Sequence, residues 1–124
     1  MNILLDTHII LWYFDGSDKL KKDWIKMIDS SENNIFYSSI STAEICLKHS
    51  IGKLELPINF FEVFLKVDWD ELSFDSKDSK ILFSLPLLHK DPFDRMLISQ
   101  SISNNFYLMT SDENIRKYDL KLTI

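Results

Sequence analysis

The feature that most constrains the fold is an alternation between short apolar runs and longer amphipathic segments. The apolar runs predict strands at about 1–5, 35–38, 71–74, 106–110 and 120–123. The segments between them favour helices at about 7–14, 18–29, 39–51, 59–66, 75–84, 92–104 and 113–118. Strands that are joined through helices run parallel and are covered on both faces. The pattern therefore predicts an α/β fold, a three-layer α/β/α sandwich with a mainly parallel central sheet.

The composition fits one domain of this kind, covering residues 1–124. Only two glycines and three prolines are present, so we expect no flexible linker that would divide the chain. No apolar run approaches the ~20 residues that a membrane-spanning helix needs. The single cysteine, Cys46, excludes an internal disulfide, and the apolar N-terminal run lacks the basic leader of a signal peptide. We therefore expect a cytoplasmic protein that does not contact membranes.

The net charge is −5, from 19 acids against 14 lysines and arginines. Taken alone, this charge argues mildly against a nucleic-acid-binding protein, because such proteins usually present a basic surface. The argument weakens if several acids converge on one point and a metal ion neutralises them there. Lysines and arginines around that point would then form a local basic surface for phosphate groups. The positions of the acids therefore matter more than their number.

Four acids fall where predicted strands and helices begin or end at one edge of the sheet. Asp6 directly follows the first strand, and Asp112 comes two residues after Thr110, at the end of the fourth. Glu44 lies in the helix after the second strand, and Asp94 lies in the first turn of the helix before the fourth. In parallel sheets, ligands bind beyond the carboxyl ends of the strands, near a topological switch point. We therefore expect these four side chains to lie together.

Each acid also has an ordinary structural explanation. Asp6 suits an Asx turn, Asp112 a helix cap, Glu44 an exposed helix position and Asp94 a capping box. Their convergence is harder to explain in this way, because like charges held together raise each other's pKa unless a cation neutralises them. Mg²⁺ is typically bound by carboxylates, waters and substrate phosphate oxygens, and such ions activate water for phosphodiester hydrolysis. The four acids thus predict a metal-dependent phosphoryl-transfer enzyme.

The segment HKDPFDRMLI at 89–98 tests this prediction, because two acids flank a proline at a helix start. Asp91 before Pro92 is a typical N-cap followed by proline at the first helical position. Asp94 either completes a capping box or binds the metal. It shares a helix face with apolar and small residues, which points its side chain toward the body of the protein. We expect Asp91 to cap the helix and Asp94 to bind the ion.

Four blocks of the sequence resemble a known family. They are LLDTH at 4–8, STAEICLKHSIGKLELP at 41–57, LHKDPFDRMLISQSI at 88–102 and LMTSDENIRKY at 108–118. In this order they resemble the PIN domain, specifically the VapC-type toxin nucleases of bacterial and archaeal toxin–antitoxin pairs, and together they cover nearly the whole chain. DPFDR followed by an apolar helix is the most specific block. The resemblance implies the same three-layer fold and a Mg²⁺- or Mn²⁺-dependent endoribonuclease held inactive by a cognate antitoxin.

The resemblance also implies roles for individual residues. The catalytic, metal-binding acids would be Asp6, Glu44, Asp94 and Asp112. The residues that would support these acids or metal-bound water are Thr7, Asp91, Thr110 and Ser111. The hydroxyl groups among them are equally good helix caps. The residues near the acidic edge that would contact RNA phosphates are Lys48, His49, Lys53 and Arg95, although each is equally well explained as a solvated charge.

Other functions fit the sequence less well. A PIN fold without catalytic activity, serving only to bind a partner protein, is the main alternative, and the presence of all four acids argues against it. A receiver domain would need paired acids after the first strand and a late Lys-Pro loop, and a haloacid-dehalogenase-type phosphatase would need DxD where this chain has DTH. We further expect a homodimer, for which the apolar run Leu11 to Phe14 would form a suitable surface if it were exposed.

Overall fold

The computed structural model describes residues 1–118 and 123–124. The strands are β1 (Asn2–Leu5), β2 (Asn34–Ser38), β3 (Asp70–Leu72) and β4 (Tyr107–Met109). The helices are α1 (Thr7–Asp15), α2 (Lys22–Asp29), α3 (Ser39–Ser50), α4 (Phe60–Phe64), α5 (Ser76–Ser84), α6 (Pro92–Asn104) and α7 (Glu113–Arg116). Their order along the chain agrees with the alternation in the sequence. Within the described residues, no helix is both long enough and apolar enough to span a membrane.

The four strands form one sheet in the order β3-β2-β1-β4, and every pairing is parallel. The chain moves outward from β1 through β2 to β3 and then returns to place β4 on the other side of β1. The order therefore reverses between β1 and β4, and the crevice beyond their carboxyl ends is the expected ligand site in such a sheet. The predicted three-layer α/β/α architecture is confirmed.

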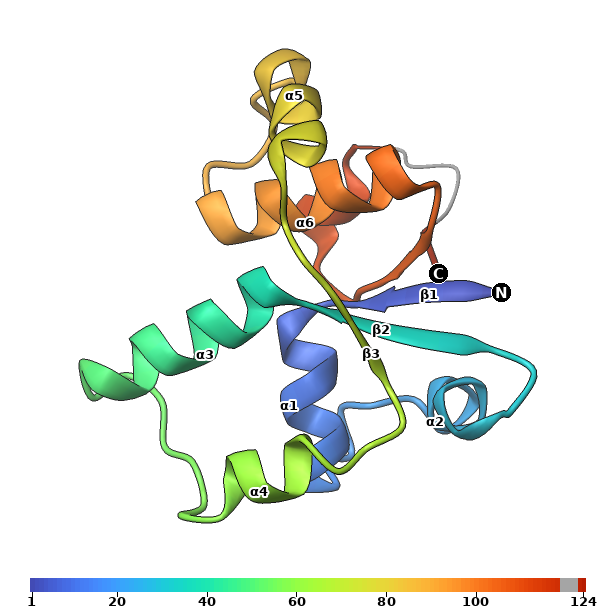
Figure 1. Ribbon diagram of the computed structural model, residues 1–124, viewed down its shortest axis with the longest axis vertical. Coiled ribbons are helices and arrows are strands. Elements are labelled where there is room, and N and C mark those ends of the chain that lie inside the picture. The colour runs from blue at the N-terminus through green and yellow to red at the C-terminus, as the bar shows by residue number, and fades with distance from the viewer. Residues whose placement is uncertain (119–122) are drawn as a thin grey trace.

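β1 is covered on both faces, because its alternate side chains enter two different hydrophobic clusters. Ile3 and Leu5 pack in the cluster built from α1, α2 and α4, whereas Leu4 packs in the cluster formed with α6, β4 and α7. All three side chains are completely buried. Figure 1 shows α1, α2 and α4 on one side of the sheet and α5 and α6 on the other, while α3 extends from the carboxyl edge.

Two predicted elements have different bounds in the structure, and a third lies mainly outside the described residues. The helix expected from residue 18 begins only at Lys22, because Ser17 Oγ accepts a hydrogen bond from the backbone N–H of Lys19 and holds a turn there. The strand expected at 120–123 falls mainly outside the described residues. Thr123, which is described, forms an isolated parallel bridge with Leu108. The third strand is also shorter than expected, because it ends at Leu72.

The apolar run Leu11 to Phe14 is not an exposed surface. All four side chains are half-buried and pack against the larger hydrophobic cluster. Phe14 makes edge contacts with the rings of Phe60 and Phe64, at centroid distances of 5.8 and 5.6 Å. These residues therefore stabilise the fold between α1 and α4. A homodimer stays a prediction, but the run that motivated it does not provide the surface.

Candidate active site

The structure brings the four acids together at the carboxyl edge of the sheet. Asp6 follows β1 and Asp112 is the N-cap of α7, so both lie at the switch point between β1 and β4. Burial is the main cause of the raised pKa of both Asp6 and Asp94; the charge of Asp94 adds to it at Asp6, and the charges of Asp91, Asp112 and Glu44 add to it at Asp94. Four segments far apart in the sequence thus place their carboxylates within one electrostatic site.

Asp6 is the most deeply buried of these acids, with only 2% of its surface exposed. Burial raises its pKa to about 6, and the nearby Asp94 contributes in the same direction. Its Oδ2 accepts a hydrogen bond from Thr110 Oγ1 at 2.8 Å, whereas its Oδ1 is buried and has no hydrogen-bond partner among the described residues. A buried carboxylate oxygen without a donor is costly unless a cation binds it.

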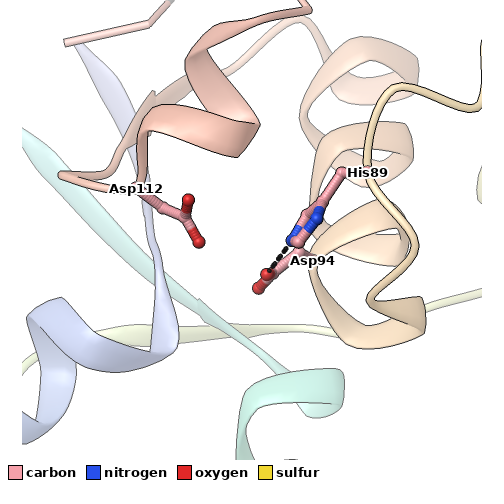
Figure 2. A group of neighbouring side chains, drawn as sticks. All are labelled: His89, Asp94 and Asp112. Carbon is pink, nitrogen blue, oxygen red and sulfur yellow. Dashed lines mark hydrogen bonds and ion pairs between the residues drawn. The ribbon is translucent and has the colours of Figure 1, made fainter.

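Figure 2 shows Asp94 and Asp112 facing each other across the edge of the sheet, with His89 beside Asp94. One potential ligand atom from each of the three residues lies within 4.8 Å of the others. His89 Nε2 is 2.7 Å from Asp94 Oδ2. Sequence reasoning gave His89 no role. The sequence does place His89 five residues before Asp94, in HKDPFDR. The contact between the two side chains, however, depends on how the loop after α5 turns back.

The two acids that flank Pro92 have different structural roles. Asp91 is the N-cap of α6, and its Oδ1 accepts a hydrogen bond from the backbone N–H of Asp94 at 2.9 Å. The side chain of Asp94 does not return to the cap. It faces the acidic site instead, where burial and the neighbouring negative charges raise its pKa. The predicted capping role of Asp91 is confirmed, and metal binding by Asp94 stays a prediction.

Glu44 reaches the site from the second turn of α3, and Lys48 lies one turn further along the same helix. Lys48 Nζ donates to Glu44 Oε2 at 2.6 Å. Glu44 is 4% exposed, and its other oxygen, Oε1, is buried without a hydrogen-bond partner among the described residues. The Glu44 carboxylate is the main cause of the raised pKa of Lys48.

These residues fit a divalent cation with oxygen ligands. Among the described residues, Asp6 and Glu44 each leave one buried oxygen without a donor. Asp94 and Asp112, with His89, form the group whose ligand atoms lie within 4.8 Å of one another, and Asp6 and Glu44 lie outside that group but interact electrostatically with Asp94. Carboxylate oxygens are the ligands that Mg²⁺ and Mn²⁺ prefer. Asp6, Glu44, Asp94 and Asp112 are therefore the residues that could hold such an ion.

Comparison with known families identifies the fold. The PIN domain family matches residues 3–121. The chain belongs to the PIN domain family. This match covers all four acidic positions as well as the four sequence blocks that resembled the family.

Solved structures with the same PIN architecture share little sequence with this chain. VapBC2 from Rickettsia felis, bound to a DNA fragment from its promoter, aligns over 100% of this chain and 98% of that chain, with a TM-score of 0.77 and 18% identity. FitAcB from Neisseria gonorrhoeae aligns over 98% and 96%, with a TM-score of 0.70 and 18% identity. VapBC-1 from nontypeable Haemophilus influenzae aligns over 99% and 96%, with a TM-score of 0.72 and 16% identity. No curated protein matches the chain.

The hydroxyl-bearing residues of this PIN domain differ in how they relate to the acids. Thr110 is central, because its Oγ1 donates to Asp6 Oδ2 and accepts from the backbone N–H of Asp112 at 3.0 Å. Thr7 does not bind an acid through its hydroxyl, which donates instead to Ser41 Oγ at 2.9 Å and ties α1 to α3. Ser111 is exposed, and within the described residues no hydrogen bond joins its hydroxyl to the site.

The basic residues of the PIN domain also separate into two groups. Lys48 and Lys53 line a cavity of about 130 Å³ together with Glu44, and their contact with phosphate stays a prediction. His49 is exposed, and its Nδ1 lies 2.9 Å from the carbonyl oxygen of Leu54, across the turn after α3. The expectation that His49 contacts phosphate therefore has no support from its position, because its ring is engaged in this turn.

Arg95 has a structural role that the sequence did not predict. Its guanidinium donates to the carbonyl oxygens of Pro86 and Leu85 and to the hydroxyl of Tyr118, at 2.9, 3.3 and 2.9 Å. It also donates to the carbonyl oxygen of His89. These bonds engage the half-buried guanidinium, so Arg95 holds the loop that carries His89, and its contact with phosphate stays a prediction. The sequence could not reveal this, because every partner is a backbone carbonyl or a distant tyrosine.

Proposed function

We propose that this protein is a metal-dependent endoribonuclease that hydrolyses RNA phosphodiester bonds and is the VapC-type toxin of a toxin–antitoxin pair. The observation that carries the proposal is the acidic site at the β1–β4 switch point, where Asp6 and Glu44 each bury a carboxylate oxygen that has no donor among residues 1–118 and 123–124. Membership of the PIN family and the structural likeness to VapBC and FitAcB support it.

Asp6, Glu44, Asp94 and Asp112 would hold Mg²⁺ or Mn²⁺. When bound, such an ion activates water and neutralises charge on the phosphate that is attacked. The surrounding residues prepare the acids for this task. Thr110 fixes Asp6 through its hydroxyl, and His89 fixes Asp94 at 2.7 Å. Lys48 and Lys53, at the neighbouring cavity, attract the phosphate backbone of RNA.

The proposed partners follow from the same comparison. VapBC2 was solved bound to a DNA fragment from its promoter. From the likeness to this protein we carry over only the proposal that a cognate antitoxin binds this chain. The antitoxin would cover the acidic edge and keep the nuclease inactive. The protein would work in the cytoplasm, where RNA substrates are available, and would form the predicted homodimer.

The first test is cleavage of a structured RNA by the purified chain with Mg²⁺ or Mn²⁺. Asp6→Asn and Asp112→Asn should each lower the rate by orders of magnitude while circular dichroism shows an intact fold. Asp68→Asn, an exposed acid away from the site, is the matched control and should cleave normally. Full activity in saturating EDTA would disprove the proposal. A chain that binds a partner but never cleaves RNA would be a PIN-fold binding module instead.

A further inference from the structure

Lys48 is a cation already positioned within the acidic site. It lies four residues after Glu44 on α3, and this spacing places the two side chains on one helix face. The Glu44 side chain is 5% exposed and that of Lys48 is 38% exposed, so the pair spans from the buried site to its rim. At 2.6 Å, the contact is a short, charge-assisted hydrogen bond.

The charge of Lys48 acts on more than its direct partner. Asp91 and Asp94 also attract it, in addition to Glu44. Lys48 therefore sits beside the region where Glu44 and Asp94 influence each other. Sites that use two metal ions place them about 3.5–4 Å apart, which requires carboxylates that are available to both. Here Glu44 is engaged by an ammonium group, and that ammonium would repel a second cation placed next to it.

We propose that Lys48 takes the place of a second metal ion, so that the site binds one divalent ion through Asp6, Asp94 and Asp112 while Lys48 neutralises Glu44. This inference rests on the proposed function, because it divides the acids of the same site. It narrows the ligands of the bound ion from four acids to three, because Glu44 then serves as the partner of Lys48 through Oε2. Glu44 Oε1, which has no partner among the described residues, is the oxygen that a second ion would use once Lys48 is replaced. The proposed arrangement also predicts a property that can be measured without RNA, the number of ions bound per chain.

The decisive experiment is Mn²⁺ binding to the purified full chain, measured by equilibrium dialysis and by the electron paramagnetic resonance signal of free Mn²⁺. The wild-type protein should bind one ion. Lys48→Met should bind two, because Glu44 is released and the repelling charge is gone. Lys48→Arg retains the charge and should bind one. The double variant Glu44→Gln with Lys48→Met should return to one, because it lacks the ligand for the second ion.

Lys66→Met is the matched control. Lys66 forms an i,i+4 pair with Glu62 on the exposed surface of α4, at 3.9 Å, so the same charge is removed at the same spacing away from the site. It should bind one ion, like the wild-type protein. Glu44→Gln alone should also bind one Mn²⁺ ion per chain. This variant tests the inference if Lys48→Met does not fold.

Several outcomes would overturn the inference. Two ions in the wild-type protein, one ion in a folded Lys48→Met variant, or loss of the ion in Glu44→Gln would each show that Glu44 and Lys48 do not divide the site in this way. Two ions in the wild-type protein would leave the proposed metal-dependent function standing. A wild-type protein that binds no Mn²⁺ would remove both proposals.

Discussion

Asp6 makes the stability of the metal-free protein depend on pH. Its pKa is about 6 in the folded chain against an ordinary value of 3.8, so the folded state binds its proton more tightly than the unfolded state. Stability is therefore lost as pH rises from about 4 to about 6, when the buried carboxylate must ionise. The two-unit difference corresponds to about 3 kcal/mol. Unfolding by urea in EDTA, measured between pH 4 and pH 8, should show this decline.

Asp6→Asn should flatten that decline, because the amide stays neutral across the whole range. Asp68→Asn, at an exposed position, should keep it. Saturating Mn²⁺ should also reduce the decline in the wild-type protein, because a bound cation favours the ionised carboxylate. A metal-free wild-type protein whose stability rises between pH 4 and pH 6 would contradict the assignment of a raised pKa to Asp6.

Replacing Asp91 and replacing Asp94 should have opposite effects on stability and on RNA cleavage. Asp91→Ala removes the cap of α6 and should cost about 0.5–2 kcal/mol of stability, with RNA cleavage retained in the folded fraction. Asp94→Asn should leave stability unchanged or raised, because repulsion from the neighbouring acids is relieved, and should abolish cleavage. Melting temperature and cleavage rate, measured for both variants, separate the roles. An active Asp94→Asn protein would remove Asp94 from the metal site.

Single residues were predictable from sequence when their role depends on their position in a strand or helix. Asp6 follows a buried strand and Asp91 precedes a proline, and both positions can be identified without coordinates. His89 and Arg95 were not predictable in this way. Their roles depend on the path of the loop between α5 and α6, which brings His89 to Asp94 and the loop carbonyls to Arg95. Sequence periodicity carries no information about such a path.

At the scale of helices, α5 and α6 are joined by a buried acid. Asp78 is 1% exposed and forms a capping box with Asp75, whose backbone N–H donates to Asp78 Oδ2 at 3.0 Å. Asp78 Oδ1 accepts from Ser103 and Asn104 near the end of α6. Asp78→Ala should therefore destabilise the protein in urea unfolding by about 1 kcal/mol or more, because it leaves three partly buried donors, on Asp75, Ser103 and Asn104, without this acceptor.

Asp75→Ala is the matched comparison for this link. It removes the half of the capping box in which Asp75 Oδ1 accepts from the backbone N–H of Asp78, and it leaves the contacts of the Asp78 side chain intact, so it should destabilise the protein less than Asp78→Ala. Equal losses in the two variants would mean that the cap alone matters and that the link to α6 contributes nothing.

The helix boundaries show where local sequence signals are sufficient. Asp75 and Asp91 were identifiable caps, and both cap the helices as expected. The cap of α3 was expected at Ser39 or Ser41, and the structure places it one residue earlier. Ser38 is the cap, with its Oγ accepting from the backbone N–H of Ile40 at 3.0 Å. Tertiary packing, which buries Ser41 against Thr7, decides among residues with equal local preference.

For the whole molecule, a bound ion should stabilise the folded state. The four acids converge only in the folded chain, so the ion binds the native state and not the unfolded one. At Mn²⁺ concentrations about 100 times the dissociation constant, the gain should be about 2.7 kcal/mol. Thermal melting with and without Mn²⁺ measures it. Asp112→Asn should lose the gain, whereas the same increase in that variant would place the ion elsewhere.

The global fold was predictable because alternating strands and helices leave few arrangements other than a covered parallel sheet. The strand order was not predictable from the pattern alone. It depends on which strands pair across long separations, such as β1 with β4, where the backbone N–H of Asp6 donates to the carbonyl oxygen of Met109 at 3.0 Å. The sequence thus indicated that a switch point would bind the ligand, and the coordinates located it between β1 and β4.

The hydrogen bond from Thr110 to Asp6 joins positions that are 104 residues apart. Translation proceeds from the N-terminus, so Asp6 leaves the ribosome long before Thr110 and Asp112 have been added. While these later residues are still missing or inside the ribosome, β1 lacks its neighbour β4 and the acidic site lacks Asp112. If the chain is the nuclease that we propose, it could not attack RNA during most of its own synthesis. A fragment that ends before residue 112 would lack Asp112 from the proposed site, and the proposed antitoxin would be needed only once Thr110 and Asp112 have been added and have folded against β1.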